Sequence, residues 1–152
     1  MTTTSIIRQL TASMNDTLSA FKLSERDLKR TYRKGGWTIR EVLIHIADCE
    51  TVFVDRVRRI IAEERPLLMP FDENSWITNF GGKNRDFVTT AMLFEVNRMT
   101  LIETLSVSYT KHQKRVGVHA AMGLVTLHDQ VTKVITHTEH HNAQISKALR
   151  SR

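Results

Sequence analysis

Two histidines four residues apart are the part of this sequence with the clearest chemical potential. His137 and His141 lie in the stretch 137–145, inside a segment whose apolar residues recur with helical periodicity. Side chains four residues apart lie on one face of an α-helix, about one turn from each other. A third histidine, His45, lies far upstream in another segment of helical periodicity. If the two helices pack together, the three imidazoles could bind one divalent metal ion.

An ion bound by three neutral imidazoles keeps at least one coordination position open, which is typical of catalytic rather than structural sites. Imidazole ligands suit zinc, nickel, copper and iron, so this set does not identify the ion. A metal lowers the pKa of a bound water and converts a bound thiol to thiolate. The pattern therefore predicts hydrolysis or the transfer of a thiol sulfur to an electrophile. The alternative is that the histidines are core polar residues that bind no metal.

Four further residues are candidates near these histidines. Cys49 could be a ligand or redox group, although a small buried apolar residue is the simpler interpretation. Asp48, three residues after His45, could orient an imidazole or be a solvated carboxylate. Asp72 and Glu73 lie in a long connection and could reach the open coordination position, or could simply cap a turn. We take Asp48 and Asp72 as weak catalytic candidates.

The remaining histidines are weaker candidates. His140 is offset by about 100° from His141 on a helix, so we expect it to face outward. Gln144 could face the metal pocket or a neighbouring helix. The other three are predicted to be surface or loop residues because they lack a helical histidine partner: His112, His119 and His128.

Four long segments with apolar residues at three- and four-residue steps are predicted to be helices that position these side chains. The second has the strongest start, because Thr38 and Glu41 match a capping box and Trp37 and Val42 match a hydrophobic staple. In the third, the apolar side is predicted to consist of Val88, Met92, Val96, Met99 and Ile102. The four segments are 5–21, 38–64, 85–109 and 126 to the C-terminus, with a short one near 24–27.

Two connections separate the later helices. The stretch 66–83 contains both prolines and several aromatic residues, so we expect it to pack on the helices, with a helical turn near 72–78. The stretch 110–124 is predicted to be a polar break. Together these features predict one all-α domain over residues 1–152, a four-helix bundle whose long second connection allows a crossover.

Composition excludes several classes of protein. The chain has 152 residues and a formal charge of +6, but its basic residues are interleaved with acidic ones, which disfavours nucleic-acid binding. No apolar run is long enough to cross a membrane, and the first residues lack the order of a signal peptide. With a single cysteine, the chain can form no intramolecular disulfide. These features predict a cytoplasmic protein without nucleic-acid or membrane partners.

Two motifs resemble those of a known family. The stretch 36–48 is similar to the W-S-x-x-E-x-x-x-H-x-x-D opening of the DinB/YfiT-like superfamily, and 137–145 is similar to its H-x-x-H-H-x-x-Q-I signature. The stretches 66–76 and 117–127 resemble one subgroup, although 118–121 departs from its usual H-P-E. The resemblance covers nearly the whole chain.

The resemblance implies a four-helix bundle of up-down-down-up topology that binds a divalent metal, most often nickel or zinc. The metal ligands it implies are His45, His137 and His141. It also implies a homodimer and a small-molecule substrate, with either hydrolase activity or transfer of a low-molecular-weight thiol. The alternative from another class is a non-catalytic stress-response module that binds a metal or ligand.

Overall fold

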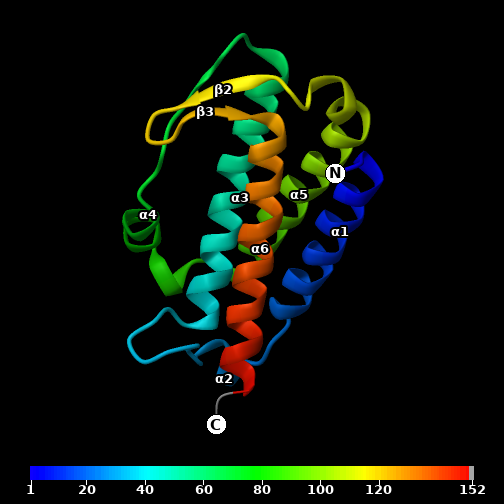
Figure 1. Ribbon diagram of the computed structural model, residues 1–152. Coiled ribbons are helices and arrows are strands. Elements are labelled where there is room, and N and C mark those ends of the chain that lie inside the picture. Colours follow the sequence, from blue (N-terminus) through cyan, green and yellow to red (C-terminus); the bar gives the residue numbers. More distant parts are fainter. Residues whose placement is uncertain (151–152) are drawn as a thin grey trace.

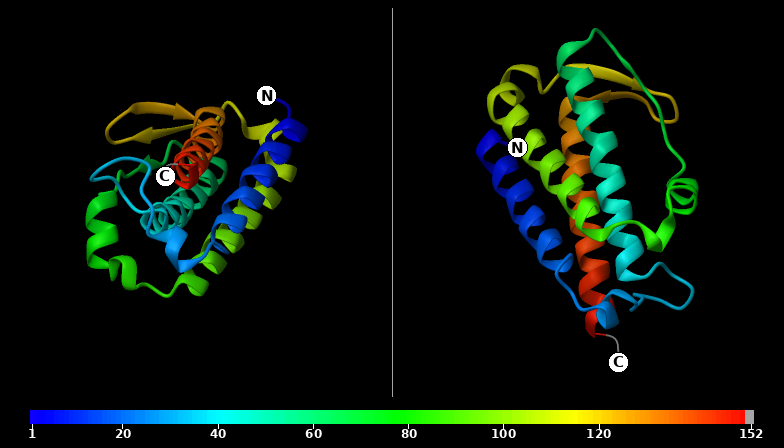
Figure 2. Two further views of the ribbon diagram at one scale, coloured as in Figure 1. Left: turned by 90° about the horizontal axis from the view of Figure 1, so that it is seen from below. Right: turned by 180° about the vertical axis from the view of Figure 1, so that it is seen from behind.

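The computed structural model describes residues 1–150, leaving aside the side chain of Lys83, and its main feature is a bundle of four long helices (Figure 1). Each long helix packs against two others: the first against the last and the second middle helix, and the last also against the first middle helix, while the two middle helices pack on each other. Figures 1 and 2 show that the first and last helices run in one direction and the two middle helices in the other. This confirms the predicted up-down-down-up bundle. The four helices are α1 (Thr3–Ala20), α3 (Ile39–Ala62), α5 (Phe87–His112) and α6 (Leu127–Arg150).

The two helices that carry the histidines both begin at strong side-chain caps. At the start of α3, the Thr38 N–H donates to Glu41 Oε2 at 2.8 Å, and the Glu41 N–H donates to Thr38 Oγ1 at 3.2 Å. Thr126 and Asp129 exchange the same pair of bonds at the start of α6. Each cap satisfies backbone N–H groups that the first helical turn leaves free. The predicted capping box is therefore confirmed, and local sequence fixes where both helices begin.

The connection between α3 and α5 returns along the outside of the bundle, which gives the predicted crossover (Figure 2). It contains the predicted helical turn, since Asp72 accepts a hydrogen bond from the Ser75 N–H and caps a short helix. Gly81 (φ 91°) and Gly82 (φ 50°) follow in the left-handed region that favours glycine. The short helices of the chain are α2 (Glu25–Leu28), α4 (Glu73–Asn79) and the 3₁₀ helix η1 (Gly82–Asn84).

A three-stranded sheet at one end of the bundle was missed by the sequence prediction, which treated 110–124 as a polar break. Strand β1 (Leu67–Leu68) pairs in parallel with β2 (Val116–His119), which pairs antiparallel with β3 (Gly123–Thr126). The strands have two to four residues, too few for a clear alternating pattern. Two of them also depend on a partner that lies far away in the sequence.

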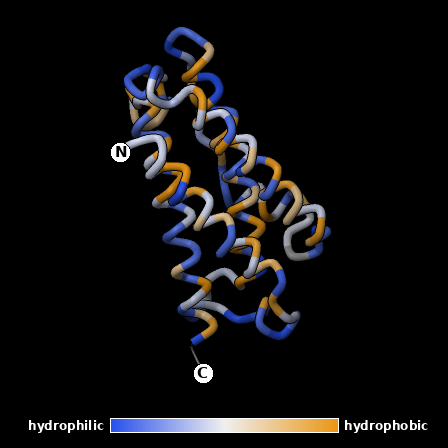
Figure 3. Tube along the Cα trace, turned by 90° about the vertical axis from the view of Figure 1, so that its right-hand side faces the viewer, coloured by the Kyte–Doolittle hydropathy of each residue, from blue (hydrophilic) through white to orange (hydrophobic). Residues whose placement is uncertain are grey.

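The prediction of which side of α5 faces the core was also wrong. Four of its five residues are 56–69% exposed: Val88, Met92, Val96 and Met99. The buried side is instead centred on Arg98, which lies among Phe94, Leu101 and Leu105. A charged residue in the middle of the core-facing side masks the true periodicity. In Figure 3, hydrophobic positions on the long helices alternate with hydrophilic ones, as amphipathic helices require.

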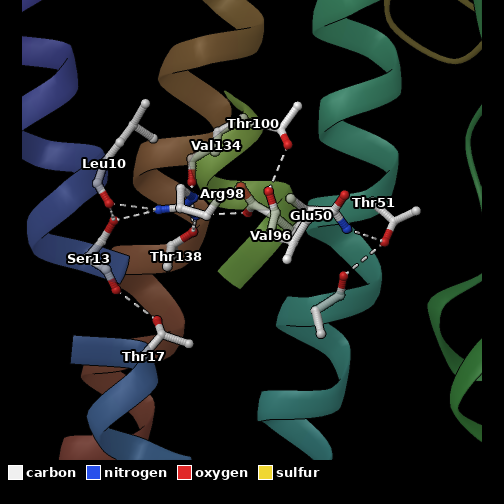
Figure 4. A network of polar contacts seen from close by, with 12 residues as sticks. Leu10, Ser13, Thr17, Glu50, Thr51, Val96, Arg98, Thr100, Val134 and Thr138 are labelled. Carbon is white, nitrogen blue, oxygen red and sulfur yellow. Dashed lines mark hydrogen bonds and ion pairs between the residues drawn. The ribbon is translucent and has the colours of Figure 1, made fainter. Parts of the chain in front are cut away.

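The Arg98 guanidinium is the polar centre of the bundle (Figure 4). It forms a buried ion pair with Glu50 of α3, with Nε to Oε1 at 2.6 Å and Nη2 to Oε2 at 2.8 Å. It also donates to Ser13 of α1 at 2.9 Å and to Thr138 of α6 at 2.8 Å. One side chain therefore links all four long helices.

None of the helices in the described part of the chain is long and apolar enough to span a bilayer.

Candidate metal centre

The packing of α3 against α6 brings the three predicted histidines together. The ring centroids lie 5.1 Å apart for His45 and His137, 4.8 Å for His45 and His141, and 4.5 Å for His137 and His141. One nitrogen from each ring lies within 4.8 Å of the other two. The Nε2 atoms of His45 and His137 are 3.1 Å apart. Two nitrogens bound to one zinc ion at its usual bond length lie roughly 2.9–3.4 Å apart, so this pair fits a shared ion.

Burial keeps all three imidazoles neutral at physiological pH. Desolvation, reinforced by His141, lowers the pKa of His45 to about 3. Desolvation and the neighbouring histidines lower the pKa of His137 to about 2, and desolvation also lowers the pKa of His141. A neutral imidazole presents its lone pair directly, so a metal need not displace a proton.

Neighbouring side chains hold the rings in place. The His141 Nδ1–H donates to Gln144 Oε1 at 2.8 Å, which leaves Nε2 of His141 free to be a ligand. The Trp37 ring packs 5.0 Å from the His45 ring, and the Phe53 ring lies 5.3 Å from that of His137. Gln144 was predicted to face either this pocket or a neighbouring helix, and in the structure its side chain is hydrogen-bonded to His141.

His45 also has a thiol and a carboxylate close to its Nε2 atom. Cys49 Sγ lies 3.5 Å away, and Glu73 Oε2, from the start of α4, lies 3.9 Å away. Burial raises the pKa of the Cys49 thiol well above its usual range, so it stays protonated, and the side chain belongs to the apolar core. The Glu73 carboxylate is half exposed and thus reaches the histidines from the solvent side.

The two weak catalytic candidates lie in other interactions. Both oxygens of Asp48 accept hydrogen bonds from Arg85 at 2.8 Å. Asp72 caps α4 through Ser75. Of the acidic residues considered from the sequence, Glu73 is the one that the structure brings within 4 Å of a histidine nitrogen in the cluster.

A pocket of about 250 Å³ opens beside His137. His119, predicted to be a surface or loop residue, is 7% exposed and lines this pocket from the end of β2, which corrects that prediction. Sequence reasoning also missed Arg56 and Gln130 in its wall. An arginine between the inward-facing Phe53 and Val57 of α3 was the available signal. The pocket is lined by Cys49, Phe53, Arg56, Pro70, Phe71, Glu73, His119, Met122, Val125, Asp129, Gln130, Lys133 and His137.

The fold and the cluster together define a four-helix-bundle protein with a candidate three-histidine metal site. The chain belongs to the DinB superfamily, which it matches over residues 9–145. This agrees with the family identified from the two histidine motifs.

Curated relatives carry names that fit such a site. The chain is 31% identical over 132 residues to "Putative metal-dependent hydrolase YfiT" of Bacillus subtilis, covering 84% of this chain and 72% of the relative. It is 29% identical over 144 residues to "Putative metal-dependent hydrolase OB0413" of Oceanobacillus iheyensis, covering 94% and 81%. The solved structure of Bacillus subtilis YfiT superimposes with a TM-score of 0.89 at 25% identity, covering 97% of this chain and 86% of that one. That protein is described as "a probable metal-dependent hydrolase with an unusual four-helix bundle topology".

Proposed function

We propose that this protein is a metal-dependent enzyme that activates a water or a low-molecular-weight thiol against a small electrophile. The observation that carries the proposal is the convergence of His45, His137 and His141, all neutral, beside a pocket. The hydrolase names of the relatives support it. When bound, the ion would supply Lewis acidity and lower the pKa of a water or thiol.

In this proposal the protein's own groups have separate tasks. The three histidines hold the ion, and Gln144 keeps His141 in the tautomer that presents Nε2. Glu73, 3.9 Å from His45 Nε2, is placed to accept the proton that the water or thiol loses. The buried Cys49 completes the wall beside His45 as a neutral thiol.

The ion in this proposal is nickel or zinc, as the family resemblance implies, and imidazole nitrogens suit both. The substrate is a small molecule because the pocket beside His137 has a volume of only about 250 Å³. A homodimer and a cytoplasmic location, implied by the resemblance and the composition, stay predictions.

The second candidate function is a non-catalytic module that binds a metal or ligand. The same three histidines would serve it, because nothing in their geometry demands turnover. The position of Glu73 favours the enzyme, since a storage or sensing site does not need a half-exposed carboxylate as proton acceptor. Loss of turnover with full metal content in Glu73→Gln would identify the enzyme.

The metal content of each chain tests the site directly. Wild-type protein purified without chelator should contain about one nickel or zinc ion per chain by elemental analysis, and His45→Ala and His137→Ala should lose it. His112→Ala, at the end of α5 and outside the cluster, is the matched control and should keep the ion. Equal metal content in all four proteins would refute the three-histidine site. No metal in wild type after loading and desalting would refute the enzyme as well.

A further inference from the structure

Arg56 is a buried cation without an anionic partner. Its side chain lies in the wall of the pocket beside His137, called the histidine pocket below, and the residue is 8% exposed. Nη2 donates to the Met69 carbonyl at 2.5 Å, whereas Nε has no hydrogen-bond partner among residues 1–150. Within that same range no carboxylate forms an ion pair with Arg56. Arg85 and Arg98, by contrast, pair with Asp48 and Glu50.

A second donor without a partner lies in the same pocket. Gln130 is 5% exposed, and its Nε2 atom is unpaired within the described chain. Lys133, one turn further along α6, adds a second positive charge to the lining. The wall therefore offers two unsatisfied N–H donors and two cationic side chains.

The acidic groups of the pocket are occupied elsewhere. Asp129 accepts bonds from the N–H and hydroxyl groups of Thr126 at the start of α6. Glu73, which also lines the pocket, lies 3.9 Å from His45 Nε2. Asp55, which precedes Arg56, is exposed and pairs with Arg59. The negative charge of Asp55 acts on Arg56 at longer range and raises its pKa, but none of these three carboxylates forms an ion pair with the guanidinium.

An unpaired buried charge is costly unless something neutralises it. Arginine cannot lose its proton to escape this cost, because its pKa stays high even where burial lowers it. A bound carboxylate would neutralise the charge and accept hydrogen bonds from such donors. The apolar part of the wall consists of Phe53, Phe71, Pro70, Met122 and Val125. A pocket that combines apolar side chains with cationic ones suits a molecule with an apolar body and one carboxylate.

We propose that this pocket binds the carboxylate of a small amphipathic acid through Arg56 and Gln130, next to His137 of the histidine cluster. This inference extends the proposed function by naming the chemical class of its substrate. It assigns the two side chains to substrate binding and leaves the chemistry to the histidine cluster.

The experiment compares hexanoate with its neutral analogue hexanamide by NMR titration of metal-free and metal-loaded protein. The metal-free arm excludes direct coordination of the carboxylate by an ion. Wild type should bind hexanoate about tenfold or more tightly than hexanamide, as expected for a charge-assisted hydrogen bond. Arg56→Gln should abolish this preference. Arg58→Gln, an exposed arginine on the same helix, is the matched control and should retain it.

Each outcome decides the proposal. Equal affinity of wild type for hexanoate and hexanamide would overturn it, and this comparison does not depend on whether any variant folds. A preference that survives in Arg56→Gln would also overturn it, because the carboxylate would then bind elsewhere. Arg56→Gln should unfold at the same temperature as wild type or higher, since it removes an unpaired buried charge. Failure of the metal test would leave the metal-free titration unchanged, so the two proposals fail separately.

Discussion

Two buried arginines in this protein have opposite surroundings. Arg98, fully buried at the centre of the bundle, forms five hydrogen bonds, which matches the number of N–H donors on a guanidinium. Arg56, in the wall of the histidine pocket, forms one, to the Met69 carbonyl. The protein itself therefore provides acceptors for all the N–H donors of Arg98, whereas Arg56 Nε has no acceptor within the described chain. A structural ion pair needs a hydrogen-bond partner for every buried N–H donor, whereas a ligand-binding site needs donors that the protein itself leaves without a partner.

The same contrast extends to the other buried polar atoms. Four buried side-chain atoms lack a partner among residues 1–150, and three of them belong to residues that line the pocket: Arg56 Nε, Gln130 Nε2 and His137 Nδ1. The fourth, Thr132 Oγ1, belongs to a residue outside that lining. Buried polar atoms without a hydrogen-bond partner are rare in folded proteins, so the presence of three of them in the lining of one pocket indicates a site that can bind a ligand.

Removing the carboxylate that pairs with Arg98 should have the largest effect on stability. Glu50→Ala leaves the Arg98 charge buried without its carboxylate, and we expect a loss of about 3–5 kcal/mol in the free energy of unfolding. Denaturant unfolding measures this loss. Glu103→Ala, an exposed glutamate on α5, should change the free energy by less than about 0.5 kcal/mol. Similar values for the two variants would mean that the Arg98 centre does not hold the bundle together.

A smaller effect is expected when the orientation of one histidine is disturbed. Gln144→Ala removes the acceptor for the His141 Nδ1–H, and we expect metal affinity to fall about 10- to 100-fold. Competition with a chelator of known affinity measures the change. Gln144→Glu retains an acceptor oxygen at this position and should stay close to wild type. Unchanged affinity in Gln144→Ala would remove Gln144 from the description of the site.

The smallest effect is expected from acidification of the metal-free protein, which tests whether burial keeps His45 neutral. The pKa of His45 falls from 6.5 to about 3 on folding, so below pH 6.5 the unfolded chain binds a proton that the folded chain excludes. Stability should therefore be fully retained above pH 6.5 and should decline as the pH falls toward 3, by about 1.4 kcal/mol per pH unit for this histidine.

Unfolding in denaturant and chelator between pH 7 and pH 5 measures this decline. His45→Leu should reduce the slope, whereas His112→Ala, which alters a histidine outside the cluster, should retain it. The carboxylates of Asp27, Asp72, Asp86 and Asp129 do not interfere, because hydrogen bonds lower their pKa values further from this pH range. An identical slope in His45→Leu would show that His45 is not held neutral by burial.

Much of the bundle could be predicted because its signals are local. The capping pairs at Thr38 and Thr126 operate within one helical turn, so they define the starts of α3 and α6 without any tertiary contact. The four-residue spacing of His137 and His141 likewise places both rings on one face of any helix that contains them. The superfamily could be identified from these same two segments.

Errors arose where a partner distant in sequence decides the structure. The sheet depends on the pairing of Leu67 with Val118, and the burial of α5 depends on Glu50 neutralising Arg98. An arginine on a helix is ordinarily read as a solvent-facing residue, so the sequence pattern alone put the wrong side of α5 toward the core.

The sequence by itself determined the helices, their starting points and which residues could be metal ligands. Only the tertiary structure decided that Glu73 lies beside His45 while Asp48 and Asp72 have other partners, and that Arg98 is neutralised while Arg56 is not. The reason is physical. Helix formation depends on neighbours within a few residues, whereas the satisfaction of a buried charge depends on which groups from other helices meet it.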